Sequence, residues 1–227
     1  MNQIPEKLIQ IRERIRRAAR ACGRSPDEIT LLAVSKTKPA SDVLTAYKAG
    51  QREFGENYLQ DALPKIQAVR KPGIEWHFIG RIQSNKAAEI SRHFSWVHGL
   101  DRLKHAERLS TQRPTELAPL QVCLQVNLSA EASKGGVKPE DLPALAAAVS
   151  RLPGLKLRGL MTMPNPDTEA AAQRAVFARL RLLLQDLCAR GLDLDTLSMG
   201  MSADMEAAIA EGSTMVRIGT DIFGARP

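Results

Sequence analysis

The chain has 227 residues, a length at which single α/β barrels are common, so we expect one domain spanning residues 1–227. Hydrophobic residues make up 44% of the chain and charged residues 25%, as in ordinary globular proteins, which excludes disordered and collagen-like chains. The longest apolar stretches, such as Ala144 to Val149, are far shorter than the roughly 18 residues of a membrane span. The charged N-terminal segment argues against a secretory signal, so we expect a cytoplasmic protein without a membrane partner.

The net charge of +7 and the isoelectric point near 9.6 raise the question of a nucleic-acid partner. The basic residues are scattered, however, and aromatic residues are only 4% of the chain, so basic and aromatic side chains do not interleave as they do where bases stack. We therefore expect no specific nucleic-acid partner. Cys22, Cys123 and Cys188 lie far apart, and no cluster has metal-ligand spacing, so we predict neither a disulfide framework nor a metal site.

The chain begins with an amphipathic helix that carries Ile4, Leu8, Ile11 and Ile15 on one stripe and is expected to end at Gly23. Eight strand-like segments follow, at residues 30–35, 53–55, 76–80, 96–98, 120–127, 155–161, 196–200 and 215–218. Helical segments separate them, at residues 41–49, 57–69, 84–93, 102–112, 140–151, 168–190 and 203–211, and several are preceded by expected N-caps, namely Ser41, Ser84 and Ser202. This alternation predicts an α/β protein, a single (β/α)8 TIM barrel with an extra N-terminal helix. An open doubly wound sheet is the alternative.

The first predicted strand ends with Ser35 and Lys36, just before a loop. Alternate residues of a strand share a face, so Leu32, Val34 and Lys36 point the same way. If they point into the barrel, Lys36 lies at the mouth where barrel enzymes carry their chemistry. Partial desolvation there lowers the pKa of an amine and prepares it as a nucleophile or a Schiff-base amine. The alternative is a solvated loop lysine.

Glycine-containing turns follow the last two predicted strands. After the eighth strand, Gly219 and Thr220 begin a turn that we expect to be helical. After the seventh, Gly200 is expected to let the chain approach a ligand, and Ser202 can donate a hydrogen bond. Backbone N–H groups in such turns bind anions, and many barrels hold a phosphate in the loops after strands seven and eight. The sequence therefore predicts a phosphate site.

Six motifs, spread from the first strand to the last, resemble those of one family, the YggS/PROSC-type pyridoxal 5′-phosphate (PLP) homeostasis proteins. The motifs are LLAVSKTKP (31–39), FGENYLQ (54–60), WHFIGRIQSNK (76–86), RGLMTMP (158–164), LSMGMSADMEAAI (197–209) and GSTMVRIGTDIFG (212–224). The family resembles the barrel domain of alanine racemase, a fold-type III PLP-binding protein, in agreement with the predicted barrel. The sequence departs from the family pattern at Arg81-Ile82, where Gly-x-Leu-Gln is more usual, and we expect this change beside the pocket wall.

The resemblance implies that Lys36 carries PLP as a Schiff base, that Ser202, Gly219 and Thr220 hold its phosphate, and that Arg217 faces its pyridine nitrogen. For Arg217 the alternative is a core-edge arginine in a salt bridge.

Asn57 follows the second predicted strand and His77 lies on the third, so both are candidates for contacts with the ring or its hydroxyl. For His77 a packed core position is the alternative. Glu56 is expected to be solvated or capping.

The resemblance further implies a role in intracellular vitamin B6 homeostasis, with little or no catalysis, PLP-requiring apoenzymes as recipients, and a monomer or weak dimer. The alternative is a PLP-dependent amino-acid racemase or related enzyme. Racemisation needs two acid/base groups that flank the cofactor, and alanine racemase takes the second, a tyrosine, from an additional domain. The two tyrosines here, Tyr47 and Tyr58, are not expected to face Lys36, so we predict a carrier and assign no catalytic residue.

Overall fold

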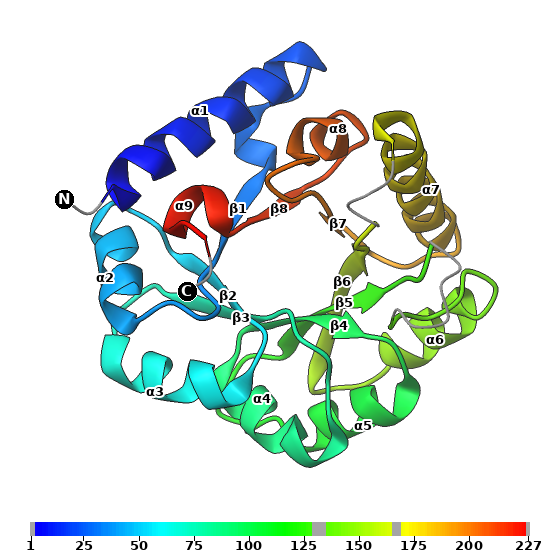
Figure 1. Ribbon diagram of the computed structural model, residues 1–227. Coiled ribbons are helices and arrows are strands. Elements are labelled where there is room, and N and C mark those ends of the chain that lie inside the picture. The colour runs from blue at the N-terminus through cyan, green and yellow to red at the C-terminus, as the bar shows by residue number, and fades with distance from the viewer. Residues whose placement is uncertain (1–2, 129–134, 165–168, 226–227) are drawn as a thin grey trace.

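The computed structural model describes residues 3–128, 135–164 and 169–225. Its strands are β1 (Thr30–Val34), β2 (Glu53–Glu56), β3 (Glu75–Phe78), β4 (Trp96–Leu100), β5 (Leu120–Gln125), β6 (Leu155–Met161), β7 (Thr196–Ser198) and β8 (Met215–Ile218). Each strand pairs in parallel with the next, and β8 pairs with β1 to close a barrel (Figure 1). The predicted (β/α)8 barrel is confirmed, and the open doubly wound sheet is wrong.

A ring of helices surrounds the barrel (Figure 1). The helices between strands are α2 (Ala40–Lys48), α3 (Leu59–Val69), α4 (Ala87–His93), α5 (Leu103–Thr111), α6 (Leu142–Val149), α7 (Ala170–Ala189) and α8 (Met205–Ala210). Two more lie outside this alternation: α1 (Ile4–Ala21) precedes β1, and the short α9 (Thr220–Phe223) follows β8. Helix α1 packs beside α8 and α9. Among the helices of the described ranges, none combines the length and apolar character that crossing a membrane requires.

The helix ends test the predicted capping residues. Gly23 follows the C-cap of α1 with φ of 72°, and the next N–H, that of Arg24, donates to the carbonyl of Ala19 at 2.9 Å. This is the Schellman arrangement that glycine favours, so the predicted end of α1 is confirmed.

The three predicted serine N-caps are wrong. Ser41 lies inside α2, which begins at Ala40 after Pro39, and Ser84 is the first residue of the 3-10 helix η2 (Ser84–Lys86). The N-cap of α8 is Asp204 rather than Ser202. Its Oδ1 accepts from the backbone N–H of Met201 at 2.5 Å, and this turn carries the chain past Ser202 before the helix starts.

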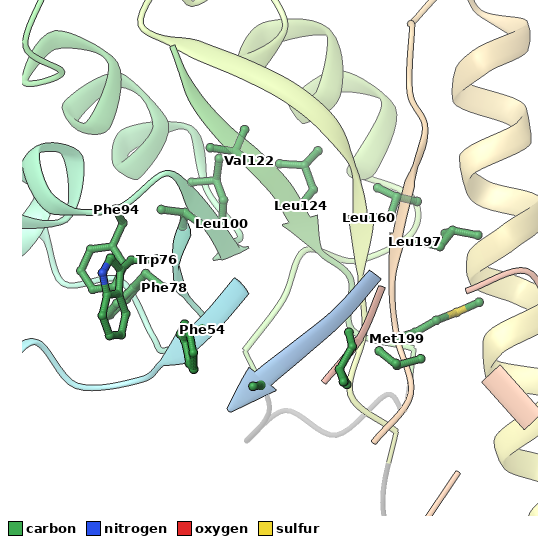
Figure 2. Packing of buried hydrophobic residues seen from close by; sticks show 14 of the residues in the cluster. Phe54, Trp76, Phe78, Phe94, Leu100, Val122, Leu124, Leu160, Leu197 and Met199 are labelled. Atoms are coloured by element: carbon green, nitrogen blue, oxygen red, sulfur yellow. The ribbon is translucent and has the colours of Figure 1, made fainter. Parts of the chain in front are cut away.

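The outer core lies between the strands and the surrounding helices (Figure 2). An aromatic group forms one side of it, in which Phe54 packs on Trp76 with ring centroids 5.7 Å apart and Phe78 packs edge-on against Phe94 at 5.3 Å. Aliphatic side chains continue the layer around the barrel, among them Leu100, Val122, Leu124, Leu160 and Leu197. Burial of these side chains supplies the main favourable free energy of folding.

The inside of the barrel is built differently. Its apolar cluster is small and consists of Leu32, Trp96, Cys123, Met161 and Met215. Buried polar side chains share this space, namely His77, His98, Ser198 and Arg217.

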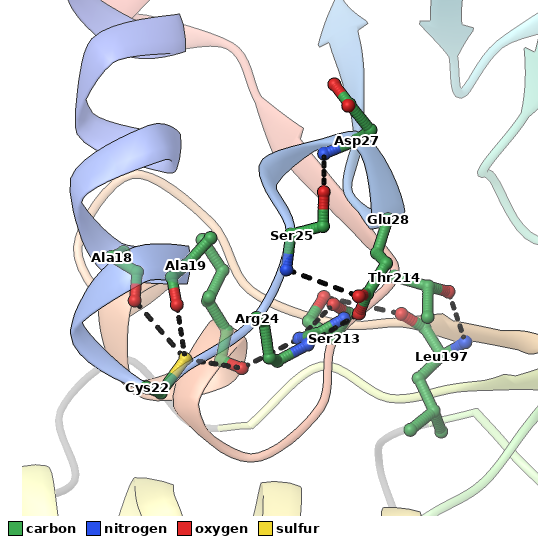
Figure 3. A network of polar contacts seen from close by, with 11 residues as sticks. Ala18, Ala19, Cys22, Arg24, Ser25, Asp27, Glu28, Leu197, Ser213 and Thr214 are labelled. Atoms are coloured by element: carbon green, nitrogen blue, oxygen red, sulfur yellow. Dashed lines mark hydrogen bonds and ion pairs between the residues drawn. The ribbon is translucent and has the colours of Figure 1, made fainter.

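Arg24, just after α1, connects the segment that leads into β1 with the loop before β8 through hydrogen bonds (Figure 3). Its Nη1 donates to the carbonyls of Ile209 and Ser213, at 2.9 and 2.8 Å, and its Nε donates to Glu28 at 3.1 Å. The Ser213 hydroxyl in turn donates to the carbonyl of Met199 at 2.7 Å. These bonds hold the connection into β1 against the loop that leads into β8, so they support the closure of the barrel.

Candidate functional site

A cavity of about 270 Å³ opens at the C-terminal end of the barrel. Five of the six residues selected from the sequence line it: Lys36, Ser202, Arg217, Gly219 and Thr220. Apolar side chains form much of the remaining wall, among them Val34, Ile79, Met163 and Met201. A mostly apolar cavity with a few convergent polar groups is typical of a small-molecule site.

Lys36 reaches this cavity because of the alternation along β1. Leu32 lies in the inner cluster, Val34 lines the cavity, and Lys36 follows two residues later on the same wall. The condition on which Lys36 was expected at the barrel mouth is met, because this face of β1 points inward. The next residue, Thr37, has φ of 64°, a left-handed conformation that is uncommon for a β-branched residue. Such strained backbone is often found at functional sites.

A buried ion pair fixes the end of β1 from the other side. Lys65 of α3 donates to Glu56 at 2.6 Å and to the carbonyl of Ser35 at 2.8 Å, and the Ser35 hydroxyl donates to the same Glu56 oxygen at 2.5 Å. Glu56 is fully buried, and burial raises the pKa of its carboxyl in spite of the Lys65 charge. The expectation that Glu56 is solvated or capping is wrong. The pair anchors the residue that immediately precedes Lys36.

Sequence reasoning missed Lys65, although its position carried a signal. The buried residues of α3 are Leu59, Ala62, Lys65 and Val69, so the lysine falls on the apolar stripe of the helix. A lysine on a buried stripe needs a partner, and the carboxylate that ends β2 provides it.

Asn57 does not belong to the wall of the cavity, unlike the other five predicted residues. It is half-buried, and its Oδ1 is a buried acceptor without a hydrogen-bond partner among the described residues. Glycine at position 80 permits the close approach of the Asn57 backbone, since a Cβ at Gly80 would lie 2.0 Å from the carbonyl oxygen of Asn57. A buried acceptor without a partner is costly, but this oxygen does not face the cavity in the structure.

The loops after β7 and β8 form the other end of the cavity. Ser202 and Gly219 are half-buried and Thr220 is exposed at the start of α9, which confirms the expected helical turn. A Cβ at Gly219 would lie 3.2 Å from the carbonyl oxygen of Val34, so glycine permits this close approach to β1. Gly200 has a different role from the one predicted. A Cβ at this position would lie 2.7 Å from the Cβ of Ala208, so the glycine allows α8 to pack closely rather than a ligand to approach.

Arg14 of α1 ties these two loops together from outside the barrel. Its guanidinium pairs with Glu206 of α8 at 2.9 Å and with Asp221 of α9 at 2.8 Å. It also donates to the backbone carbonyl of Ser202 at 3.2 Å. The extra N-terminal helix therefore contacts the site directly, which the sequence did not predict.

Arg217 is buried beneath the cavity and also lines it. Its Nη1 donates to the carbonyl and hydroxyl of Ser198 at 2.6 and 2.9 Å, and its Nη2 donates to the carbonyl of Thr162 at 3.0 Å. Burial lowers the pKa of Arg217 to about 10, which leaves it charged at neutral pH. Within the described part of the chain the guanidinium is held by carbonyl and hydroxyl oxygens and forms no salt bridge, which disagrees with the alternative of a core-edge salt bridge.

His77 lies below the cavity rather than in its wall. It is fully buried, stacks on Trp96 with ring centroids 5.4 Å apart, and makes a 3.0 Å hydrogen bond to His98. Arg81 is exposed and Ile82 is buried in the outer core, so the departure from the family pattern is not beside the pocket wall. At position 82 the sequence has isoleucine where the family pattern has leucine, so one apolar side chain stands in place of another.

The chain belongs to the family of the alanine racemase N-terminal domain, whose family model matches residues 7–227. It is 62% identical to the pyridoxal phosphate homeostasis protein of Pseudomonas aeruginosa over 226 residues, which cover 100% of this chain and 97% of that protein. It is 56% identical to the protein of that name from Escherichia coli, with 100% and 98% of the two chains covered. The resemblance found in the motifs is confirmed.

Solved structures agree with this assignment. PipY of Synechococcus elongatus, at 39% identity, superposes with a TM-score of 0.88 without PLP and 0.87 with PLP bound, over 98% of this chain and 100% of PipY. Alanine racemase of Corynebacterium glutamicum is only 18% identical, with a TM-score of 0.69 over 95% of this chain and 61% of the racemase. That likeness shows the shared barrel fold alone.

Proposed function

We propose that this chain is a PLP-binding protein of vitamin B6 homeostasis, with Lys36 as the covalent attachment point. The observation that carries the proposal is the convergence of Lys36, Ser202, Arg217, Gly219 and Thr220 on one cavity. The names of the bacterial relatives and the PLP-bound PipY structure support the choice of ligand.

The donor set fits PLP at each of its polar groups. When bound, PLP would supply an aldehyde, and Lys36 is the amine that would hold it covalently. Ser202, Gly219 and Thr220 would hold the phosphate with hydroxyl and backbone donors. Arg217 would face the ring nitrogen. Asn57 lies behind the cavity wall, so its Oδ1 would accept from the ring hydroxyl only after its side chain turns toward the cavity.

The proposed role is that of a carrier with little or no catalysis. Racemisation requires a second acid/base group opposite Lys36. Tyr47 donates to the carbonyl of Pro72, and Tyr58 is 60% exposed, and neither belongs to the cavity wall. Arg217 retains its proton at neutral pH and so is a poor acid for the ring nitrogen. These features favour a carrier over a racemase or related enzyme.

The remaining parts of the proposal concern the setting of the protein. We propose that it works in the cytoplasm as a monomer or weak dimer, and that PLP-requiring apoenzymes receive its cofactor.

Borohydride reduction of the PLP-loaded protein, followed by peptide mapping, tests the attachment point. The expected adduct is on Lys36. An adduct on Lys38, which also lines the cavity, would overturn the assignment.

Solvent deuterium exchange at the α-carbon of alanine tests the carrier role. We expect exchange far slower than enzyme turnover. Exchange at about 1 per second or faster would favour the racemase alternative.

A further inference from the structure

Four buried side chains on four different strands form a continuous line of hydrogen bonds inside the barrel, and the line ends at Arg217 beneath the cavity. Arg217 Nη1 lies 2.9 Å from the hydroxyl of Ser198, this hydroxyl lies 2.8 Å from Nδ1 of His98, and Nε2 of His98 lies 3.0 Å from Nδ1 of His77. These residues come from β8, β7, β4 and β3. We call Arg217, Ser198, His98 and His77 the inner network.

The guanidinium and the Glu75 carboxylate together favour one order of donors and acceptors in the inner network. Arg217 has only donors, so the Ser198 oxygen accepts and its own hydrogen is available for Nδ1 of His98. His98 then carries its hydrogen on Nε2 and donates it to Nδ1 of His77. His77 carries its hydrogen on Nε2, which has no hydrogen-bond partner among the described residues but lies 3.9 Å from the Glu75 carboxylate, a favourable charge for an N–H. The opposite order would leave the serine hydrogen without an acceptor among the described residues and turn a nitrogen lone pair toward that carboxylate.

Both histidines are neutral in this arrangement. Burial lowers the pKa of His77 to about 3 and that of His98 well below its ordinary value, to which the Arg217 charge also contributes. The inner network therefore carries a single positive charge, located on Arg217. A guanidinium whose Nη1 is held by oriented acceptors is preorganised, because little reorientation of the group is needed when a ligand arrives.

We infer that His98 is a positioning residue for ring recognition. By taking the hydrogen of Ser198, it keeps the serine oxygen oriented as an acceptor and fixes the plane of the Arg217 guanidinium toward the cavity. A guanidinium fixed in this way favours a ring atom with a lone pair over a carbon atom at the same position. This inference rests on the proposed function, since it assumes that Arg217 faces the ring nitrogen.

The test compares the affinities of the protein for PLP and for 1-deaza-PLP, in which carbon replaces the ring nitrogen. We expect the wild type to prefer PLP about tenfold or more, the value of one hydrogen bond to a charged group. His98→Leu should reduce this preference to about a third or less while the borohydride adduct at Lys36 persists. His98→Asn offers both an acceptor and a donor and should restore much of the preference.

Cys123→Ala is the matched control, because Cys123 belongs to the inner cluster but lies outside the inner network. It should lower stability and leave the preference unchanged. If His98→Leu does not fold, as judged by circular dichroism, Ser198→Ala removes the same link with a smaller change and should likewise reduce the preference.

Two results would overturn the inference in distinguishable ways. If Arg217→Met loses the preference for PLP while His98→Leu and Ser198→Ala keep it, Arg217 recognises the ring without help from His98. If Arg217→Met also keeps the preference, the proposed orientation of the ring is wrong and the inference fails with it. A wild type without an adduct at Lys36 would instead contradict the proposed function itself.

Discussion

Along β1, Leu31 and Ala33 pack outward into the apolar layer beneath the helices, whereas Leu32, Val34 and Lys36 follow one another up the inside of the barrel to the cavity. The same alternation holds on β4. Val97 lies in the outer core, while Trp96 and His98 lie inside. The outer faces of the strands thus serve folding, and the inner faces lead to the site.

The outer and inner faces of the strands differ in how their contributions to the free energy of unfolding depend on pH. The apolar side chains of the outer core contribute through buried area and packing, and this contribution is insensitive to pH. The buried Glu56–Lys65 pair between β2 and α3 is a titratable exception outside the barrel. The inside contains two neutral histidines and a buried guanidinium, whose contributions depend on protonation. Substitutions on the two faces are therefore expected to produce different signatures.

The largest expected effect is acid destabilisation through the inner face. His77 has a pKa near 6.5 when unfolded and about 3 when folded, so its contribution to stability is complete above pH 6.5 and is lost as the pH falls toward 3. The full loss is on the order of 5 kcal/mol. His77→Gln removes this titration. Urea unfolding at several pH values between 6.5 and 3 should show a shallower decline for the variant, and an unchanged slope would contradict the prediction.

A truncation in the outer core should lower stability by a similar or somewhat smaller amount without a pH signature. Phe94 is buried against Phe78, and Phe94→Ala should cost roughly 3–5 kcal/mol because it leaves a cavity. The same unfolding series should show a curve displaced in parallel from that of the wild type. A displacement that grows as the pH falls would show that the two faces are not independent.

Much of this division could be predicted from the sequence. Period-two alternation and the spacing of strands and helices identify all eight strands, and the alternation of Leu32, Val34 and Lys36 orients the attachment lysine. The loop residues Ser202, Gly219 and Thr220 are predictable because barrels gather the ends of strands seven and eight at one mouth.

What escaped prediction depends on contacts between segments far apart in the chain. His98 and Ser198 are separated by 100 residues and meet only because the barrel closes, and Arg14 reaches Asp221 across 207 residues. The N-caps failed for a local reason, since three serines fit the capping pattern but Pro39 and Asp204 occupy the positions where α2 and α8 start. Residue type alone does not distinguish such competitors.

Ser202, Gly219 and Thr220 form what we call the anion end of the cavity. Substitutions there test whether the inner face of the barrel alone determines the affinity for PLP. Ser202→Ala combined with Thr220→Ala deletes two hydroxyl donors, each worth roughly 1.5–3 kcal/mol toward a charged group. Affinity for PLP should fall about 100-fold or more, with some non-additivity. Affinity for pyridoxal, which lacks the phosphate, should stay near that of the wild type, because the Lys36 amine is untouched.

Lys36→Ala is the reciprocal variant to this pair. It should abolish the covalent adduct and retain measurable non-covalent affinity for PLP, since the anion site is separate from the amine. Titration of both variants with PLP and pyridoxal distinguishes the two ends. If the double variant binds PLP as tightly as the wild type, the phosphate is held elsewhere.

The smallest expected effect on PLP affinity comes from Arg14, a residue outside the barrel. Such an effect would show that binding does not depend on the inner faces of the strands alone. Arg14 neutralises Glu206 and Asp221 beside the anion end, and its side chain is 29% exposed. Such half-exposed pairs contribute about 0.2–1 kcal/mol each, and only part of this acts on the ligand, so Arg14→Met should weaken PLP binding by about fivefold or less. The two carboxylates left without their partner repel a phosphate. Pyridoxal carries no phosphate, so the affinity for pyridoxal should not change.

Arg16→Met is the matched control, because Arg16 pairs only with Glu13 on its own helix among the ion pairs of the described residues. Equal weakening of PLP and pyridoxal binding by Arg14→Met would mean that α1 supports the barrel in general rather than the anion end.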